Sequence, residues 1–465
     1  MKTMIRITGA LVLGMTSVVT GAAAQTQVKE RPPAPSAAKD FTLPARSSFT
    51  LPNGMKVTLA PFGATPKLDV QLVVRVGNVD EGPNEVWLSD LMSDLMREGT
   101  RTRTNAQINL AAADMGGSVA TSVSLDELTV SGSALSEHAA GLISLIAEIG
   151  LQPSFPEQEF ARIKQNRLRN LALQKSQPGA LAAEKFYNVL YPNHSYGRYF
   201  PTEAMLQSYT LPQLRDFYNK HVHASRAHLF VAGQFNAAAV ERTIRTAFGG
   251  WTAGTPVAPI PPQSTTRRAI YIIDRPGAVQ SSMYIGGPTI DPSHKDYRAL
   301  QVTNMLLGGA FGSRITRNIR EDKGYTYSPF SQISSRYRNA YWAEIADVTT
   351  NVTGASIKEI LAEIDRLQAE PPSASELKGV QDNMVGGYIM SGSTRGGMIG
   401  LLRSLNLHGL PESYVTQYVR SVYAVSPADV QRVARQYLND DNFAIVIVGD
   451  RKQIEEQVKP FGPIM

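Results

Sequence analysis

The sequence predicts an α+β fold built as two homologous domains, each a β-sheet covered by helices. Segments rich in Val, Ile and Tyr alternate with longer amphipathic segments of helical period. The second half of the chain repeats the pattern of the first. A chain of 465 residues, 43% hydrophobic and 18% charged, is also long enough to bury more than one core.

The two halves end on the same pattern. Residues 211–235 read LPQLRDFYNKHVHASRAHLFVAGQF, and residues 426–450 read SPADVQRVARQYLNDDNFAIVIVGD. In each, a proline opens an amphipathic helix, a polar turn follows, and an apolar strand runs into a glycine, Gly233 or Gly449. Similarity at this period indicates a duplicated domain and not a solenoid.

Residues 1–24 have the features of a secretory signal peptide. Lys2 and Arg6 precede an apolar run, and Ala22 and Ala24 satisfy the small-x-small cleavage rule. The run is shorter than the ~20 residues that a membrane span requires. We therefore expect secretion across the inner membrane, a periplasmic location if the cell is Gram-negative, and no membrane span.

Two proline-rich segments divide the mature chain. Residues 25–40 are a Pro/Ala-rich tether, and residues 251–267 are a Pro-rich linker. The predicted domains are therefore 41–250 and 268–465. The proline content of the linker predicts a semi-rigid hinge.

Composition excludes several classes of function. The formal charge of +6 is not concentrated in runs, so no nucleic-acid partner is expected. The absence of cysteine excludes disulfides, thiol nucleophiles and cysteine–zinc sites. No GK[ST] follows the glycines near residue 308, which argues against nucleotide binding, and no G-x-S-x-G serine motif occurs.

The segment Val86–Thr100, VWLSDLMSDLMREGT, predicts an amphipathic helix closed by a glycine. At 100° per residue, Asp90, Ser93, Asp94 and Arg97 fall opposite an apolar stripe. Two interpretations follow, a solvated face or a hard cation held by the two carboxylates. Two carboxylates from one helix are few ligands for such a cation.

This helix and its closing Gly99-Thr100 resemble the pitrilysin/insulinase zinc peptidases, the inverzincins, whose signature is H-x-x-E-H followed by G-T. The alignment places Asp90 at the first His, Ser93 at the Glu and Asp94 at the second His.

The family's third zinc ligand is a Glu that precedes a segment carried here as KSQPGALAAEKFYNVLYPNHSYG, and its position falls at about Asn170. Arg167 and Arg169 add positive charge nearby. The resemblance therefore implies degenerate zinc positions and no metal or other cofactor in this chain.

The second half of the chain has a motif that also resembles this family. Residues 306–331, LLGGAFGSRITRNIREDKGYTYSPFS, resemble the family's LGGGFSSRL…LREK-x-G-x-x-Y. Arg320 and Tyr327 coincide with the Arg/Tyr pair that reaches substrate in the family, and Gly308 and Gly309 are assigned to substrate binding with them. A phenol can donate to an oxyanion and an arginine can bind a carbonyl. The glycines are expected to permit positive φ and close backbone approach.

In the family's two-chain branch, separate subunits carry H-x-x-E-H and the Arg/Tyr pair, and each forms half of a clamshell from mostly antiparallel sheets. The resemblance implies that this chain is the zinc-less, substrate-binding subunit of a heterodimeric zinc metalloendopeptidase acting on peptides or unfolded polypeptides. Its partner would carry H-x-x-E-H and the zinc, and this chain alone would be inactive. Two alternatives stay open, a non-catalytic peptide-binding or scaffold subunit, and a peptidase acting alone with another metal at Asp90 and Asp94.

The segment KHVHASRAH offers a different metal site, with His221, His223 and His228. The internal repeat aligns these positions with Tyr437, Asn439 and Ala444, so the backbone at these positions needs no metal ligand and a polar turn with a partly buried ring is expected.

Overall fold

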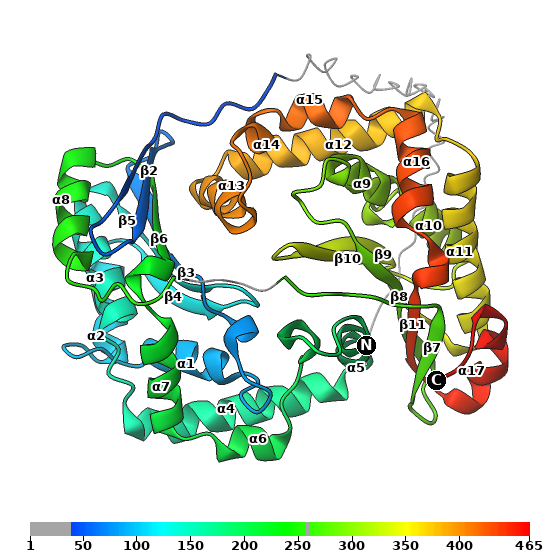
Figure 1. The fold of residues 1–465 in the computed structure, drawn as a ribbon, viewed down its shortest axis with the longest axis horizontal. Helices are drawn as coiled ribbons and strands as arrows, with labels where there is room; N and C mark the ends of the chain where they lie inside the picture. The colour runs from blue at the N-terminus through cyan, green and yellow to red at the C-terminus, as the bar shows by residue number, and fades with distance from the viewer. Residues whose placement is uncertain (1–38, 257–260) are drawn as a thin grey trace, which may run out of the picture. The chain divides into compact units, whose positions relative to one another are not determined.

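The structure, a computed structural model, describes residues 39–256 and 261–465 (Figure 1). The predicted signal peptide and most of the predicted tether lie outside the described residues. Among the residues that are described, no helix is long and apolar enough to cross a membrane.

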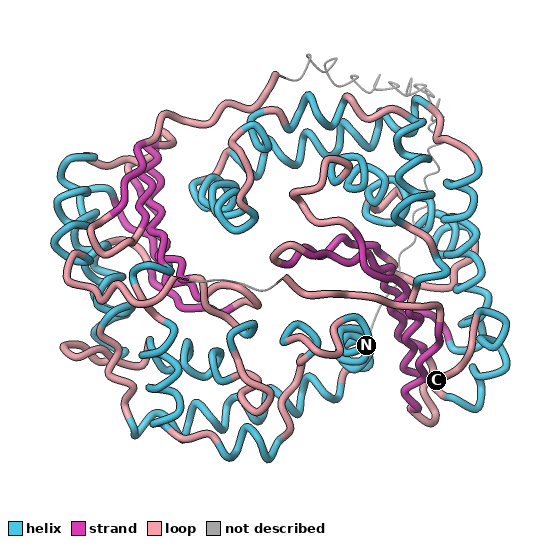
Figure 2. The backbone as a smooth tube through the Cα atoms, viewed as in Figure 1, coloured by secondary structure: helices cyan, strands magenta, loops and turns pink. Residues whose placement is uncertain are grey.

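The strands form two separate sheets (Figure 2). The first has the order β1 (Ser47–Thr50), β2 (Lys56–Pro61), β6 (Ala227–Gly233), β3 (Lys67–Val74), β5 (Leu128–Leu135) and β4 (Ser118–Val123). The second has the order β7 (Ala269–Asp274), β11 (Ala444–Gly449), β8 (Gln280–Thr289), β10 (Asn339–Thr349) and β9 (Phe330–Arg336).

The two sheets have the same topology once β1 is set aside. In each, one parallel pair, β2 with β6 or β7 with β11, is followed by antiparallel neighbours only. The strands predicted to end at Gly233 and Gly449 are the matching members β6 and β11. The predicted α+β fold with two homologous, mostly antiparallel domains is therefore confirmed.

Helices surround both sheets. Those of the first half are α1 (Leu88–Met96), α2 (Asn105–Asp114), α3 (Ala139–Leu151), α4 (Glu157–Ser176), α5 (Pro178–Leu190), α6 (Glu203–Ser208), α7 (Leu211–His221) and α8 (Ala237–Phe248). Those of the second are α9 (Tyr297–Asn304), α10 (Arg314–Thr316), α11 (Thr353–Ala369), α12 (Ala374–Gly392), α13 (Arg395–His408), α14 (Ser413–Thr416), α15 (Tyr418–Tyr423), α16 (Pro427–Tyr437) and α17 (Arg451–Val458).

The repeat extends to helix caps. Thr210 begins α7 with a capping box to Gln213, and Ser426 begins α16 with a capping box to Asp429. Both helices carry proline in the first turn, where its missing N–H costs no hydrogen bond. The matched caps explain why sequence pattern alone found these two helices.

Each sheet has its own helices on one face and a helix from the other half on the opposite face (Figure 1). Helix α5 places Phe186 and Leu190 in a core with Tyr341 and Val446 of the second sheet. Helix α13 of the second half packs on the first sheet in the same way, and its Met398 lies in a core with residues of β2, β3 and β6. The two halves are therefore interlocked by apolar burial on both sheets.

Polar contacts support the same interlock. Arg403 of α13 donates to Gln71 at 2.9 Å, to the carboxylate of Glu127 at 2.9 Å and to the hydroxyl of Thr129 at 3.2 Å. Glu127 is buried, and this guanidinium is its ion-pair partner.

The residues before β1 contact helices of the second half. The Phe41 ring lies 5.3 Å from that of Tyr388 in α12, and Asp40 forms an ion pair with Arg420 at 2.5 Å. The linker is anchored at its start, where the backbone N–H of Ala224 donates to the carbonyl of Thr252 at 3.0 Å. Pattern alone could not assign residues 40–46 to helices far away in sequence.

We predict that Arg403→Met lowers the free energy of unfolding by about 2–3 kcal/mol, because Glu127 would stay buried without its cation. Urea unfolding measures the change. Lys378→Met, which removes an exposed pair with Asp382, is the matched control and should cost less than about 0.5 kcal/mol. Equal effects of the two substitutions would contradict a role for Arg403 in the interlock.

Candidate functional site

Helix α1 presents its polar face to α4 instead of to solvent. Its apolar stripe is buried as the sequence predicts. The polar face, however, is not solvated: Ser93 is buried and its backbone carbonyl accepts a hydrogen bond from Thr121 at 2.8 Å. The prediction of a solvated face is therefore wrong, because α4 packs over it.

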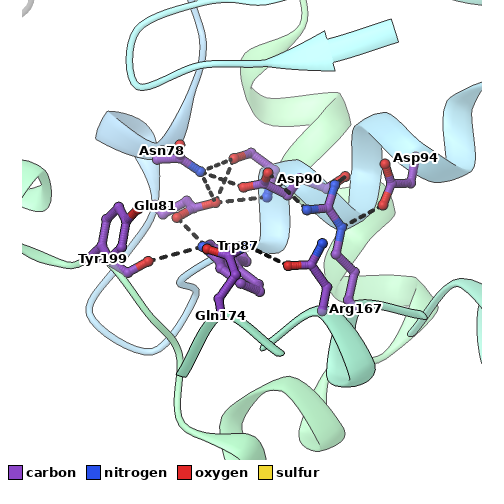
Figure 3. Close-up of polar contacts among 10 residues, drawn as sticks. Asn78, Glu81, Trp87, Asp90, Asp94, Arg167, Gln174 and Tyr199 are labelled. Carbon is purple, nitrogen blue, oxygen red and sulfur yellow. Dashed lines mark hydrogen bonds and ion pairs between the residues drawn. The ribbon is translucent and has the colours of Figure 1, made fainter. Parts of the chain in front are cut away.

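Arg167 of α4 joins the two aspartates (Figure 3). Its Nε donates to Asp94 Oδ2 at 2.5 Å, its Nη1 lies 3.3 Å from Asp90 Oδ1, and its Nη2 donates to the Asp90 carbonyl at 3.3 Å. The guanidinium thus offsets the repulsion between two carboxylates one helical turn apart.

Two further polar side chains complete this first cluster (Figure 3). The Asn78 amide donates to Asp90 at 2.7 Å and to Glu81 at 3.2 Å. Glu81 also accepts from the Ser89 hydroxyl at 2.5 Å, from the Ser89 N–H at 2.9 Å and from the Trp87 N–H at 3.1 Å. Sequence reasoning missed Asn78 and Glu81, since no local pattern marks a loop carboxylate that folds back onto a helix N-terminus.

Burial governs the protonation of this cluster. It raises the pKa of Glu81 to about 8, against the hydrogen bonds from Ser89 that favour the ionised form. Burial also raises the pKa of Asp90, and the charge of Arg167 opposes that rise. Arg167 is therefore the main charge that opposes the effect of burial on Asp90.

The residues at the family's zinc positions do not fit zinc. Zinc in proteins takes lone pairs from Cys, His or carboxylates, and a guanidinium has none to offer. Both carboxylates here are bound to Arg167, and the side chain of Asn170 is exposed and hydrogen-bonded to Gln174. Across residues 39–256 and 261–465, no group of three or more His, Cys, Asp or Glu is placed to hold a metal ion.

The same contacts argue against the alternative of another metal bound at Asp90 and Asp94. The bridging guanidinium lies where a cation would have to bind both side chains. The histidines offer no substitute, because each has a different partner. His221 Nδ1 lies 3.6 Å from Asp80, the His223 ring contacts the Lys220 carbonyl at 2.9 Å, and the His228 ring contacts Thr58 at 2.9 Å.

A second site lies on the turn between α9 and β9. Two π-helical segments, Met305–Gly309 and Arg317–Asp322, flank α10. Wide turns of this kind are rare and often occur at functional sites. Asn318 in the second segment donates to Glu359 at 3.0 Å and to Glu363 at 2.8 Å, which ties the segment to α11.

Arg320 and Tyr327 lie together on this turn. The guanidinium carbon of Arg320 is 5.2 Å from the centroid of the Tyr327 ring, and its Nη1 is 2.9 Å from the carboxylate of Glu321. Tyr327 is 81% exposed, which leaves its ring and hydroxyl open to a ligand. The structure thus brings together the two residues that the sequence placed in one site.

Gly308 and Gly309 were expected to have positive φ and to permit close backbone approach. Neither Gly308 nor Gly309 has positive φ, so that part of the prediction is wrong. Close approach is confirmed at Gly308, where a Cβ would lie 2.5 Å from Ser331 Oγ and 2.6 Å from Glu344 Oε2. The positive φ of this region, +66°, belongs to Gly324, between Arg320 and Tyr327.

Glu344 lies beneath Gly308 and is fully buried, and burial raises the pKa of its carboxyl well above the ordinary value. Gly308 is therefore a packing residue between the turn and the sheet, and direct contact with substrate is not needed to explain it.

The fold and the two sites define a class of protein. It is a duplicated α+β chain in which α1, the helix aligned with a zinc motif, has two aspartates bound to an arginine instead. Residues 61–200 match the family described as Insulinase (Peptidase family M16), and residues 208–384 match the Peptidase M16 inactive domain. The chain belongs to the M16 insulinase family.

Relatives and solved structures agree with this assignment. The uncharacterized zinc protease YmxG of Bacillus subtilis is 23% identical over 86% of this chain and 97% of its own length. A peptidase M16 inactive domain from Pseudomonas fluorescens superposes with a TM-score of 0.80 at 22% identity, covering 87% of this chain and 98% of that one. A protease from Helicobacter pylori gives 0.82 at 20% identity, covering 88% and 100%. The fold of these structures is the fold of this chain.

We predict that Arg167→Met lowers the free energy of unfolding by about 2–3 kcal/mol at pH 7.5, because Asp90 loses the charge that offsets its burial. The folded pKa of Asp90 already lies above its unfolded value and would rise further, so protonation at pH 5 should recover part of the loss. Urea unfolding at the two pH values tests this. Arg162→Met, an exposed arginine of the same helix, is the control. A loss that does not depend on pH would refute the assignment of Asp90.

We predict that Glu81→Gln destabilises the protein by about 1–3 kcal/mol at pH 6, since an amide replaces an oxygen that accepts hydrogen bonds. A folded pKa of about 8 means that the stabilisation by the neutral carboxyl is present at low pH and is lost as pH rises through 8. The difference between the two proteins should therefore narrow from pH 6 to pH 9. A constant difference across this range would show that Glu81 is ionised throughout.

Proposed function

We propose that this chain is the zinc-less, substrate-binding subunit of a heterodimeric zinc metalloendopeptidase that hydrolyses peptides or unfolded polypeptides. The proposal goes beyond family membership and rests on one combination of features. The two aspartates at the zinc-ligand positions are bound to an arginine, while Arg320 lies beside the exposed ring of Tyr327.

The two residues have complementary chemistry. The Tyr327 hydroxyl can donate a hydrogen bond to the oxyanion that forms when a peptide carbonyl is attacked. The Arg320 guanidinium has several N–H donors and can hold a backbone carbonyl of the same peptide. Asn318 and Gly324 fix the turn that carries them, so both side chains start close to their working positions.

The proposal assigns the zinc to a partner chain with H-x-x-E-H, and none to this chain. It also places the pair outside the inner membrane, in the periplasm of a Gram-negative cell, on the strength of the signal-peptide pattern in residues 1–24. A scaffold or peptide-binding subunit without a catalytic role is the second candidate, but it gives no reason for an open Tyr327 next to Arg320.

The proposal is tested by reconstituting this chain with a homologue from the same genome that carries H-x-x-E-H. The pair should cleave an unfolded peptide, and a zinc chelator should abolish cleavage. We predict that Tyr327→Phe and Arg320→Ala each lower kcat/KM by about 10- to 100-fold with the zinc content of the pair unchanged, because each removes a transition-state contact.

Matched controls come from the same turn. Arg317→Ala removes an exposed arginine from the same π-helical segment, and Tyr325→Phe removes a neighbouring hydroxyl. Both should leave kcat/KM within about twofold of the unchanged pair. Unaltered kcat/KM in Arg320→Ala and Tyr327→Phe would leave only the scaffold role, as would assembly without chelator-sensitive cleavage.

A further inference from the structure

Phe311 is an exposed aromatic side chain beside Arg320 and Tyr327, and it has no part in the function proposed for that pair. It stands on the turn between the first π-helical segment and α10, and it is 74% exposed. The centroid of its ring lies 4.2 Å from the guanidinium carbon of Arg320, nearer than the Tyr327 ring at 5.2 Å. Arg320 therefore contacts two aromatic rings, both of which also face solvent.

The rings hold Arg320 in place. A guanidinium near the face of an aromatic ring is attracted by the negative charge density of that face. Only 20% of the Arg320 side chain is exposed, and the Phe311 and Tyr327 rings are among its neighbours. Phe311 thus limits the rotamers that Arg320 can adopt and so positions its N–H donors.

The charge of Arg320 is compensated at the same time. The carboxylate of Glu321 lies 2.9 Å from Nη1, and the exposed surface beside this ion pair is that of two aromatic rings. An acidic ligand would gain little from an arginine that is already paired, and it would be repelled by Glu321. A large apolar side chain would remove the exposed faces of Phe311 and Tyr327 from water and gain by doing so.

We propose that Phe311, together with Tyr327, forms the surface that binds a large apolar side chain of the peptide held by Arg320 and Tyr327. This inference rests on the proposed function and names its substrate class, peptides with a large apolar residue at the position that reaches the turn. Phe311 is a specificity-determining residue for the peptide and a positioning residue for Arg320.

The experiment uses two fluorescent peptides that differ only in one residue, phenylalanine or serine. Binding to the mature chain is measured by anisotropy, and cleavage by the reconstituted pair is measured as kcat/KM. The unchanged chain should favour the phenylalanine peptide by about fivefold to tenfold, as expected for one aromatic contact with its buried area. Phe311→Ala should abolish the preference. Phe311→Leu should keep part of it, because it retains an apolar surface but loses the attraction to Arg320.

Leu110→Ala is the matched control, since Leu110 is 61% exposed on α2 and lies outside this turn. It should leave the preference unchanged. Thermal unfolding of each variant checks that the chain is folded. An unaltered preference in Phe311→Ala overturns the inference. Weaker assembly with the zinc-bearing chain, with the preference intact, also overturns it and makes Phe311 a contact to the partner.

Failure of this inference and failure of the proposed function are distinguishable. If Arg320→Ala and Tyr327→Phe lower kcat/KM while Phe311→Ala leaves the preference intact, the proposed function stands and the inference on Phe311 is wrong. If the isolated chain prefers phenylalanine through Phe311 while Arg320→Ala and Tyr327→Phe leave kcat/KM unchanged, the apolar binding surface stands and the catalytic role is wrong.

Discussion

One guanidinium, that of Arg167, holds the polar face of α1 against α4 in the first half of this protein. Asp90 and Asp94 are one turn apart on α1 and would repel each other, and the burial of Asp90 makes its charge costly. Arg167 compensates both and ties α4 to α1. The site is therefore satisfied by the chain's own charges, and it needs no metal ion to join these two helices. Helices α1 and α4 are joined by this ion pair at the positions that the resemblance aligns with the family's zinc motif.

The second half obeys a different constraint. In the turn between α9 and β9, Gly308 packs closely on Ser331 and Glu344. Asn318 donates hydrogen bonds to two glutamates of α11. These contacts fix the inner side of the turn, where both carboxylate oxygens of Glu344 are buried without a hydrogen-bond partner. Arg320, Tyr327 and Phe311 are left on the outer side, where two aromatic rings are largely exposed. Aromatic surface gains free energy when a ligand or partner removes it from water, and the binding role proposed for this turn rests on that gain. The reciprocal packing of α5 and α13 keeps the two halves in one interlocked unit.

Some expectations failed for physical reasons that a linear pattern cannot contain. The polar face of α1 looked solvated because amphipathicity reports which side is apolar, and not what covers the other side. Gly308 looked like a residue of positive φ because glycine permits it, yet its role is to leave room for the Glu344 carboxyl. Asn78 and Glu81 could not be found at all, since a loop residue becomes part of a cluster only when the loop folds back onto the helix.

The sequence by itself determined the duplicated α+β fold and the helices with strong caps such as α7 and α16. These follow from local periodicity and capping, which are properties of short segments. The assignment of Asp90, Ser93 and Asp94 to zinc positions, and of Arg320 and Tyr327 to one site, came from resemblance to a family and not from periodicity. Only the tertiary structure decided that Arg167 joins both aspartates, that α5 and α13 exchange between the sheets, and that Phe311 lies on Arg320. Each of these contacts joins segments that are far apart in the sequence. The segments come together because folding buries apolar surface, so no single segment predicts the contact.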